Sequence, residues 1–131
     1  MRFPKSLAQS VLGSLWIGVP ALLSSQQGTQ PQGVERTING TVVDVSCKFG
    51  HGLSGPDHLM CAQVCADKGI PLAILGDDGK LYVPVSAGMP GDNTNPTLRP
   101  HAEQKVTVKG TVFAAGGANA IRIASITPAR R

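Results

Sequence analysis

Apolar and polar residues alternate along two segments near the end of the chain, 104–114 and 120–127. This two-residue period is typical of strands with one buried face. Gly116, Gly117 and Asn119 lie between the segments and favour a turn, so the pattern predicts a hairpin. The positions that carry the pattern are Val106, Val108, Thr111 and Phe113 around Gly110, followed by Ile121, Ile123 and Ile126.

Three further strands are predicted earlier in the chain. Residues 37–46 are rich in β-branched side chains, with Gly40 at an expected bend or bulge. Residues 71–75 and 81–86 flank the turn sequence Gly-Asp-Asp-Gly at 76–79, which predicts a second hairpin. Pro84 indicates that the third strand is an edge or is irregular.

Two helices complete the pattern. Residues 58–67 are predicted to be helical, with Asp57 as the N-terminal cap and Gly69 closing the helix. Residues 95–102 are predicted to form a short helix that starts at Asn95-Pro96. The glycine-rich segment 47–56 and the segment 87–95 are expected to be loops.

The order of these elements matches one known barrel plan. A helix between the third and fourth of five strands is the arrangement of the OB-fold, a Greek-key barrel. The sequence therefore predicts a mainly β protein: a five-stranded OB-like Greek-key barrel with a short Cys/His-bearing helix inserted between strands 1 and 2. Loops after the first strand of such barrels commonly hold ligands, so the insertion stands where a site is expected.

The start of the chain has the pattern of an export signal. Arg2 and Lys5 precede an apolar run at 11–23, which is shorter than the roughly 20 residues of a membrane-spanning helix. We expect a signal peptide over 1–25, a flexible linker over 26–35, the barrel domain over 36–128 and a basic tail over 129–131. The protein is thus expected in the periplasm or outside the cell, with no stable membrane span after cleavage.

Charge and motifs exclude several functions. The chain has 12 Lys and Arg against 8 Asp and Glu, and losing Arg2 and Lys5 lowers its formal net charge from +4 to +2. The remaining basic residues are scattered, so we expect no nucleic-acid partner. No nucleophile elbow, phosphate loop or dinucleotide motif occurs, and no catalytic residue can be named. A binding or structural role is therefore favoured over an enzyme.

The strongest chemical signal is a group of four residues: Cys47, His58, Cys61 and Cys65. On a helix, the last three fall on one face, and Cys47 can approach them from the preceding segment. Thiolates and an imidazole are ligands for Zn(II), and three of them suit Cu(I). His51 and Met60 are possible additional ligands, the second one for copper.

The same cysteines also fit a structural disulfide. Cys47 can pair with Cys61 or Cys65, and such a bond would close a loop of about 15 residues, worth about 3 kcal/mol. An oxidising compartment favours this outcome. Because the chain has three cysteines, one thiol would remain next to His58.

Several runs together resemble a group of small exported bacterial proteins of unknown function with an OB-like barrel. The likeness rests on Gly40-Thr41-Val42-Val43-Asp44, on the Cys…His-x2-Cys-x3-Cys segment, and on Gly69-x-Pro71-Leu72-Ala73. It extends through Gly79-Lys80-Leu81-Tyr82, Asn95-Pro96-x-Leu98 and Val106-Thr107-Val108-Lys109-Gly110, over roughly residues 37–127. The resemblance implies export and an OB-like fold, and it implies no catalytic residues.

Two hypotheses therefore remain open. In the first, the chain is an exported binding protein for Zn or Cu, or a related small ligand, through the Cys/His cluster. In the second, it is a non-catalytic structural or interaction module, with an unknown protein partner, whose cysteines form a stabilising disulfide.

Overall fold

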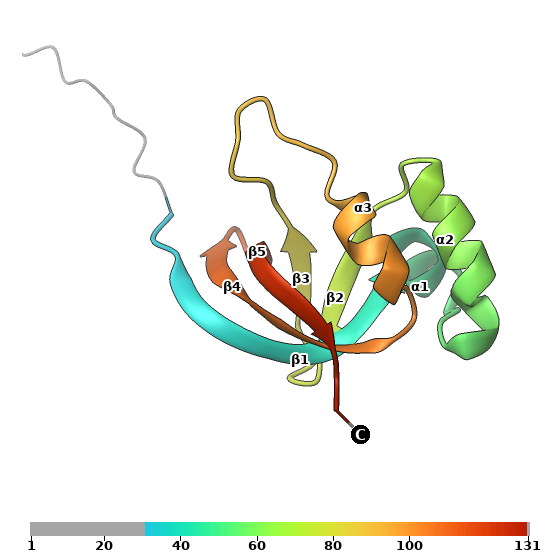
Figure 1. The fold of residues 1–131 in the computed structure, drawn as a ribbon. Coiled ribbons are helices and arrows are strands. Elements are labelled where there is room, and N and C mark those ends of the chain that lie inside the picture. The colour runs from blue at the N-terminus through green and yellow to red at the C-terminus, as the bar shows by residue number, and fades with distance from the viewer. Residues whose placement is uncertain (1–30, 131) are drawn as a thin grey trace, which may run out of the picture.

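The structure is a computed structural model that describes residues 31–130 (Figure 1). The predicted signal peptide and the first part of the predicted linker lie outside the described residues. The strands are β1 (Val34–Asp44), β2 (Leu72–Gly76), β3 (Leu81–Pro84), β4 (Lys105–Ala115) and β5 (Ala118–Pro128). The helical elements are α1 (Val45–His51), the 3-10 turn η1 (Pro56–His58), α2 (Leu59–Asp67), α3 (Asn95–Leu98) and the 3-10 turn η2 (Arg99–His101).

The five strands close into a barrel in the order β1-β2-β3-β5-β4. All neighbouring strands are antiparallel except β3 and β5, which run parallel through the pair Val83 and Ala120. This topology confirms the predicted OB-like barrel with a Cys/His helix between the first two strands. The first strand begins at Val34, two residues before the predicted start of the domain.

The core follows from the alternation in the sequence. In β4, Val106, Val108, Gly110 and Val112 are buried, and the residues that alternate with them are exposed or lie at intermediate depth. Leu98 of α3 is fully buried against the same cluster. The short helix after β3 therefore closes one end of the barrel, as its place between the third and fourth strands predicts.

Gly40 lies where β1 changes from one partner strand to the other. It pairs with Gly76 of β2 on one side and with Val106 of β4 on the other. A Cβ at this position would collide with the backbone carbonyl oxygen of Leu75. The close approach of two strands, and not a bulge in β1, explains the glycine. The register of the β4–β5 pair shifts instead between Lys109 and Gly110, where Ala124 of β5 has no partner residue in β4.

The insertion after β1 differs from the prediction in two places. The segment 47–56 was expected to be a loop, but Val45–His51 forms helix α1. Asp57 was expected to cap the second helix, but it lies inside η1, and α2 begins at Leu59 without a side-chain cap. The prediction for the end of α2 is correct, because Gly69 has a φ of 87° and closes the helix.

The insertion lies to one side of the barrel. Figure 1 shows α1 and α2 next to each other beyond the end of β1, with α3 on the neighbouring side of the barrel end. Within the described residues, no helix has the length and apolar character needed to cross a membrane. The barrel therefore serves as a rigid base from which two short helices present the cysteines.

Candidate metal centre

Cys47 is positioned by the residue that ends β1. The side chain of Asp44 caps α1, because its Oδ1 accepts a hydrogen bond of 3.0 Å from the backbone N–H of Cys47. Gly52 closes the other end of α1 with a φ of 69°, and its N–H donates to the carbonyls of Cys47 and Lys48. The cysteine is therefore held in the first turn of a helix that is capped at both ends.

Cys61 and Cys65 lie four residues apart on α2, so they project from the same side of the helix on successive turns. The other side of α2 is buried through Ala62 and Ala66. Small side chains there let the helix lie close to the barrel. The two cysteines consequently face away from the barrel and toward α1.

The end of α2 is fixed by Asn95 of α3. Its Nδ2 donates to the carbonyl of Ala66 at 3.0 Å and to that of Ile70 at 2.8 Å, and its Oδ1 accepts from the N–H of Leu72 at 3.1 Å. Asn95 is only 5% exposed, so these bonds are shielded from water. They tie the turn that follows Cys65 to the start of β2.

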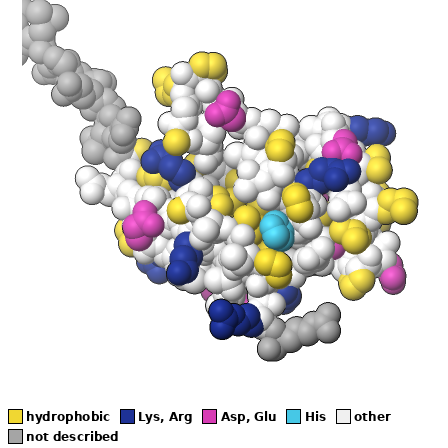
Figure 2. Space-filling model, viewed as in Figure 1, with side chains coloured by type: hydrophobic (Ala, Val, Ile, Leu, Met, Phe, Trp, Pro, Cys, Tyr) yellow, Lys and Arg dark blue, Asp and Glu magenta, His cyan; other side chains and the backbone are white. Residues whose placement is uncertain are grey.

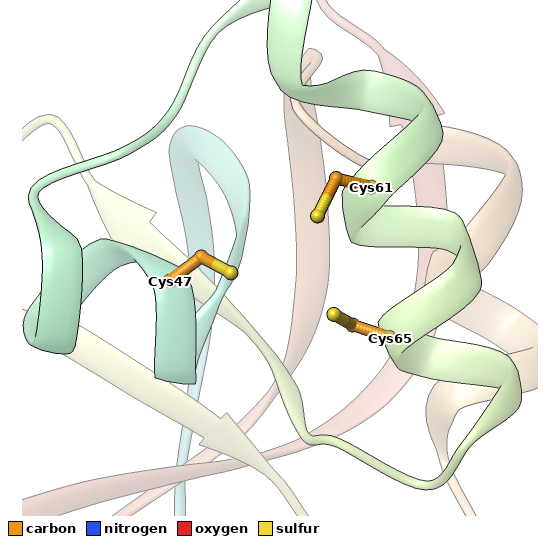
Figure 3. Close-up of side chains that lie close together, drawn as sticks. All are labelled: Cys47, Cys61 and Cys65. Carbon is orange, nitrogen blue, oxygen red and sulfur yellow. The ribbon is translucent and has the colours of Figure 1, made fainter.

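The three cysteines converge between the two helices. Their Sγ atoms all lie within 4.8 Å of one another, and Figure 3 shows Cys47 of α1 pointing toward Cys61 and Cys65 of α2. Three sulfurs bound to one ion at about 2.3 Å would be about 4 Å apart in a trigonal plane. The observed spacing is thus close to what a shared ion requires. We call Cys47, Cys61 and Cys65 the trithiol set.

His58 joins a second group that shares one residue with the first. One oxygen of Asp44, the Sγ of Cys47 and one ring nitrogen of His58 also lie within 4.8 Å of one another. Asp44 is fully buried and His58 is 9% exposed. We call Asp44, Cys47 and His58 the inner set. The four residues predicted from the sequence are therefore close enough to hold a metal ion, in two overlapping groups.

Two polar atoms of the inner set have no hydrogen-bond partner of normal geometry within residues 31–130. They are Oδ2 of Asp44 and Nε2 of His58, and both are buried. A buried polar atom without a partner costs about 1–3 kcal/mol. Such atoms in a native structure require an explanation, and ligation of a cation is one.

A third buried polar atom without a partner in the described chain belongs to Glu103, which is hydrogen-bonded to the segment before His58. Its Oε2 accepts a 2.7 Å hydrogen bond from the N–H of Gly55, and Oε1 has no partner within the described chain. The carbonyl of Gly55 in turn accepts the N–H of His58 at 2.9 Å. Glu103 has a φ of 57°, which is uncommon for a residue other than glycine. This buried side chain therefore positions the turn that carries the histidine.

Two of the thiols resist ionisation. Interaction with the Asp44 carboxyl group, followed by desolvation, raises the pKa of Cys65 to about 12. Desolvation, followed by the same carboxyl group, raises the pKa of Cys47. A metal ion binds the thiolate form, so loading the trithiol set has to release protons.

The cysteines differ in their access to solvent. Cys61 is exposed, whereas Cys47 and Cys65 are half-buried, and all three are free thiols. Of the auxiliary ligands suggested by the sequence, His51 belongs to neither group and is exposed, and Met60 is 79% exposed. An ion would thus reach the trithiol set from the side of Cys61.

Sequence reasoning missed Asp44 and Glu103. Asp44 was assigned to the interior of a strand, although its position three residues before Cys47 is that of a helix cap. Nothing in the local sequence marks Glu103, because it acts on a residue 48 positions away. No family model, curated protein or solved structure matches the chain.

The visible surface has mixed charge. Figure 2 shows Lys and Arg side chains interspersed with Asp and Glu, and hydrophobic side chains around the helices of the insertion. The exposed apolar residues of that region are Phe49, Leu53, Met60 and Val64. This face carries no continuous basic stripe of the kind that contacts a phosphate backbone.

Proposed function

We propose that the protein is an exported binding protein for one soft metal ion, Cu(I), held by Cys47, Cys61 and Cys65. The observation that carries the proposal is the convergence of three Sγ atoms from two helices to within 4.8 Å. Thiolates are the preferred ligands of Cu(I), and a three-sulfur set without a fourth ligand fits its coordination better than that of Zn(II).

The surroundings of the set support binding and release over catalysis. Exposure of Cys61 leaves one ligand accessible, so an ion can enter or leave without opening the barrel. The half-buried Cys47 and Cys65 keep the ion against the protein. The caps of α1 and the hydrogen bonds of Asn95 at the end of α2 hold the ligands in place beforehand, which lowers the entropic cost of binding.

Export is the second part of the proposal. It is supported by Arg2 and Lys5 before the apolar run 11–23, which is the pattern of an export signal. In an oxidising compartment, three neighbouring thiols are prone to disulfide formation. A bound Cu(I) ion would keep all three sulfurs engaged and protect them.

The test is a Cu(I) titration of the full chain, reduced and without oxygen, in competition with bathocuproine disulfonate. We expect one Cu(I) per chain, and we expect Cys61→Ser and Cys65→Ser to weaken binding by about 100-fold or more. His51→Ala is the matched control, because His51 is exposed on α1 and belongs to neither group. Its affinity should equal that of the unchanged protein.

The intact mass of the protein isolated from its export compartment separates the two hypotheses. A mass two hydrogen atoms lower, with no metal and no Cu(I) binding after reduction, would establish the structural disulfide and exclude the proposed function. Three free thiols with one copper per chain would exclude the disulfide.

A further inference from the structure

We infer that the inner set of Asp44, Cys47 and His58 is a second cation position, selective for Zn(II), that competes with the Cu(I) position for Cys47. The inference deepens the proposed function and rests on it, because it assumes that Cys47 is a ligand of the trithiol set.

Two buried side chains of the inner set each have a polar atom that is not fully satisfied. Oδ2 of Asp44 and Nε2 of His58 lack hydrogen-bond partners of normal geometry within residues 31–130, although both side chains are at least nine-tenths buried. Within this range, only thiols, those of Cys47 and Cys65, interact with the Asp44 side chain from outside its helix cap. Asp44 and His58 belong to the same group of potential ligands around Cys47. One cation bound there would engage the carboxylate and the imidazole at once, and thereby compensate for their burial.

The donors of the inner set suit Zn(II). A carboxylate oxygen, a thiolate and an imidazole nitrogen are all ordinary Zn(II) ligands. The carboxylate and the thiolate together balance the charge of Zn(II), and the thiol proton of Cys47 passes to solvent. Cu(I) is better served by the three sulfurs. The two sets therefore select different ions.

Cys47 belongs to both sets. Two ions on one sulfur, each at about 2.3 Å, would be at most about 4.6 Å apart and would repel each other in a partly buried site. This repulsion weakens binding of a second ion, so the two sets compete for Cys47. Zn(II) in the inner set withdraws Cys47 from the trithiol set, and Cu(I) in the trithiol set withdraws it from the inner set.

The structure also fixes the histidine independently of the other cysteines. Glu103 holds the N–H of Gly55, and the carbonyl of Gly55 holds the N–H of His58. The first bond comes from the segment before β4, the second lies within the turn η1, and neither involves Cys61 or Cys65. Changes at Cys61 and Cys65 should therefore leave the position of His58 intact, whereas Asp44 also interacts with the Cys65 thiol.

The experiment measures Zn(II) and Cu(I) affinities separately on the reduced full chain, each by competition with a chromophoric chelator. We expect His58→Gln to weaken Zn(II) about tenfold or more while Cu(I) binding stays within about threefold. The double variant Cys61→Ser/Cys65→Ser should weaken Cu(I) binding and leave Zn(II) binding within about threefold. Cys47→Ser should weaken the binding of both ions. Adding one equivalent of Cu(I) to the Zn(II)-loaded protein should release the Zn(II).

Co(II) in place of Zn(II) gives a readout that does not depend on affinity. We expect charge-transfer absorption from one thiolate, unchanged in Cys61→Ser/Cys65→Ser and altered in His58→Gln. Absorption from three thiolates, or Zn(II) affinity that depends on Cys61 and Cys65 but not on His58, would overturn the inference. Joint binding of Zn(II) and Cu(I) without competition would also overturn it.

The two proposals fail differently. If Cu(I) does not bind the unchanged protein, the proposed function is wrong whatever the Zn(II) data show. If Cu(I) binds through the trithiol set but Zn(II) does not require Asp44 and His58, only the inner position is wrong. Asp44→Asn serves as a further variant that keeps the helix cap, since Asn is as good a cap as Asp, and it should weaken Zn(II) alone.

Discussion

Asp44 and Cys47 are joined by a hydrogen bond of 3.0 Å from the backbone N–H of the cysteine to Oδ1 of the aspartate. The bond makes the last residue of β1 the cap of the helix that carries the first thiol. The second carboxylate oxygen of Asp44 stays buried beside the same cysteine without a hydrogen-bond partner in the described chain. One side chain thus caps the helix of Cys47 and also brings a carboxylate oxygen within 4.8 Å of the Sγ of Cys47 and a ring nitrogen of His58.

The first prediction concerns this cap. Asp44→Ala should expose the amide of Cys47 to faster hydrogen exchange, because the orphan N–H of the first turn loses its acceptor. Asp44→Asn should keep the amide protected, since its side-chain oxygen can accept the same bond. Hydrogen exchange followed by NMR gives the comparison, and equal protection in both variants would show that Asp44 is not the cap.

The second prediction concerns Asn95. Replacing it with alanine removes three shielded hydrogen bonds, and the free energy of unfolding should fall by about 2–4 kcal/mol. Cu(I) affinity should fall too, because the end of α2 next to Cys65 loses its anchor. Thr97→Ala on the same helix is the control, since Thr97 is exposed and its side chain makes no hydrogen bond in the described chain. The free energies of unfolding are measured by urea denaturation. Equal values for Asn95→Ala and Thr97→Ala would contradict the role of Asn95.

The third prediction concerns the order in which the thiols react. At pH 8, iodoacetamide should modify the exposed Cys61 before the half-buried Cys65, whose pKa is raised to about 12 by Asp44 and desolvation. Because this pKa lies well above the pH of the experiment, Cys65 is mostly protonated. Its rate of modification should therefore increase about tenfold per pH unit between pH 7 and 10. Peptide mass mapping follows each site. A plateau of the Cys65 rate below pH 10 would disprove the raised pKa.

The fourth prediction separates the barrel from the site. Gly40→Ala should lower the thermal midpoint, because its Cβ would collide with the carbonyl oxygen of Leu75. Gly50→Ala on α1 has open space around it and should stabilise the helix slightly. Neither residue belongs to the trithiol set, so folded protein of both variants should bind Cu(I) equally well. Weaker Cu(I) binding by folded Gly40→Ala protein would contradict this prediction, because it would show that the barrel near Gly40 affects the affinity of the site.

The sequence predicted the barrel well because its strands have strong local signals. The alternation through Val106 and Val108 and the turn before Ile121 specify the closing hairpin, and the Asp-Gly turn at 78–79 specifies β2 and β3. Helix α1 was missed because Gly50 and Gly52 indicate a loop. Gly52 in fact ends the helix, and the cap at its start was assigned to a strand.

The sequence identified Cys47, His58, Cys61 and Cys65, but it predicted only in part which of these side chains lie together. The expected face of His58, Cys61 and Cys65 assumes one continuous helix, and the helix begins at Leu59, after the 3-10 turn of His58. The imidazole is therefore grouped with Asp44 and Cys47. Contacts between distant segments, such as Glu103 with Gly55, leave no local pattern that a single sequence could reveal.

The most direct test of the central claim is X-ray absorption at the copper edge of the reduced, Cu(I)-loaded protein. We predict three sulfur neighbours at about 2.3 Å and no nitrogen or oxygen neighbour, falling to two sulfurs in Cys61→Ser. A copper ion bound to nitrogen or oxygen, or one whose sulfur count does not change in Cys61→Ser, would contradict the trithiol site.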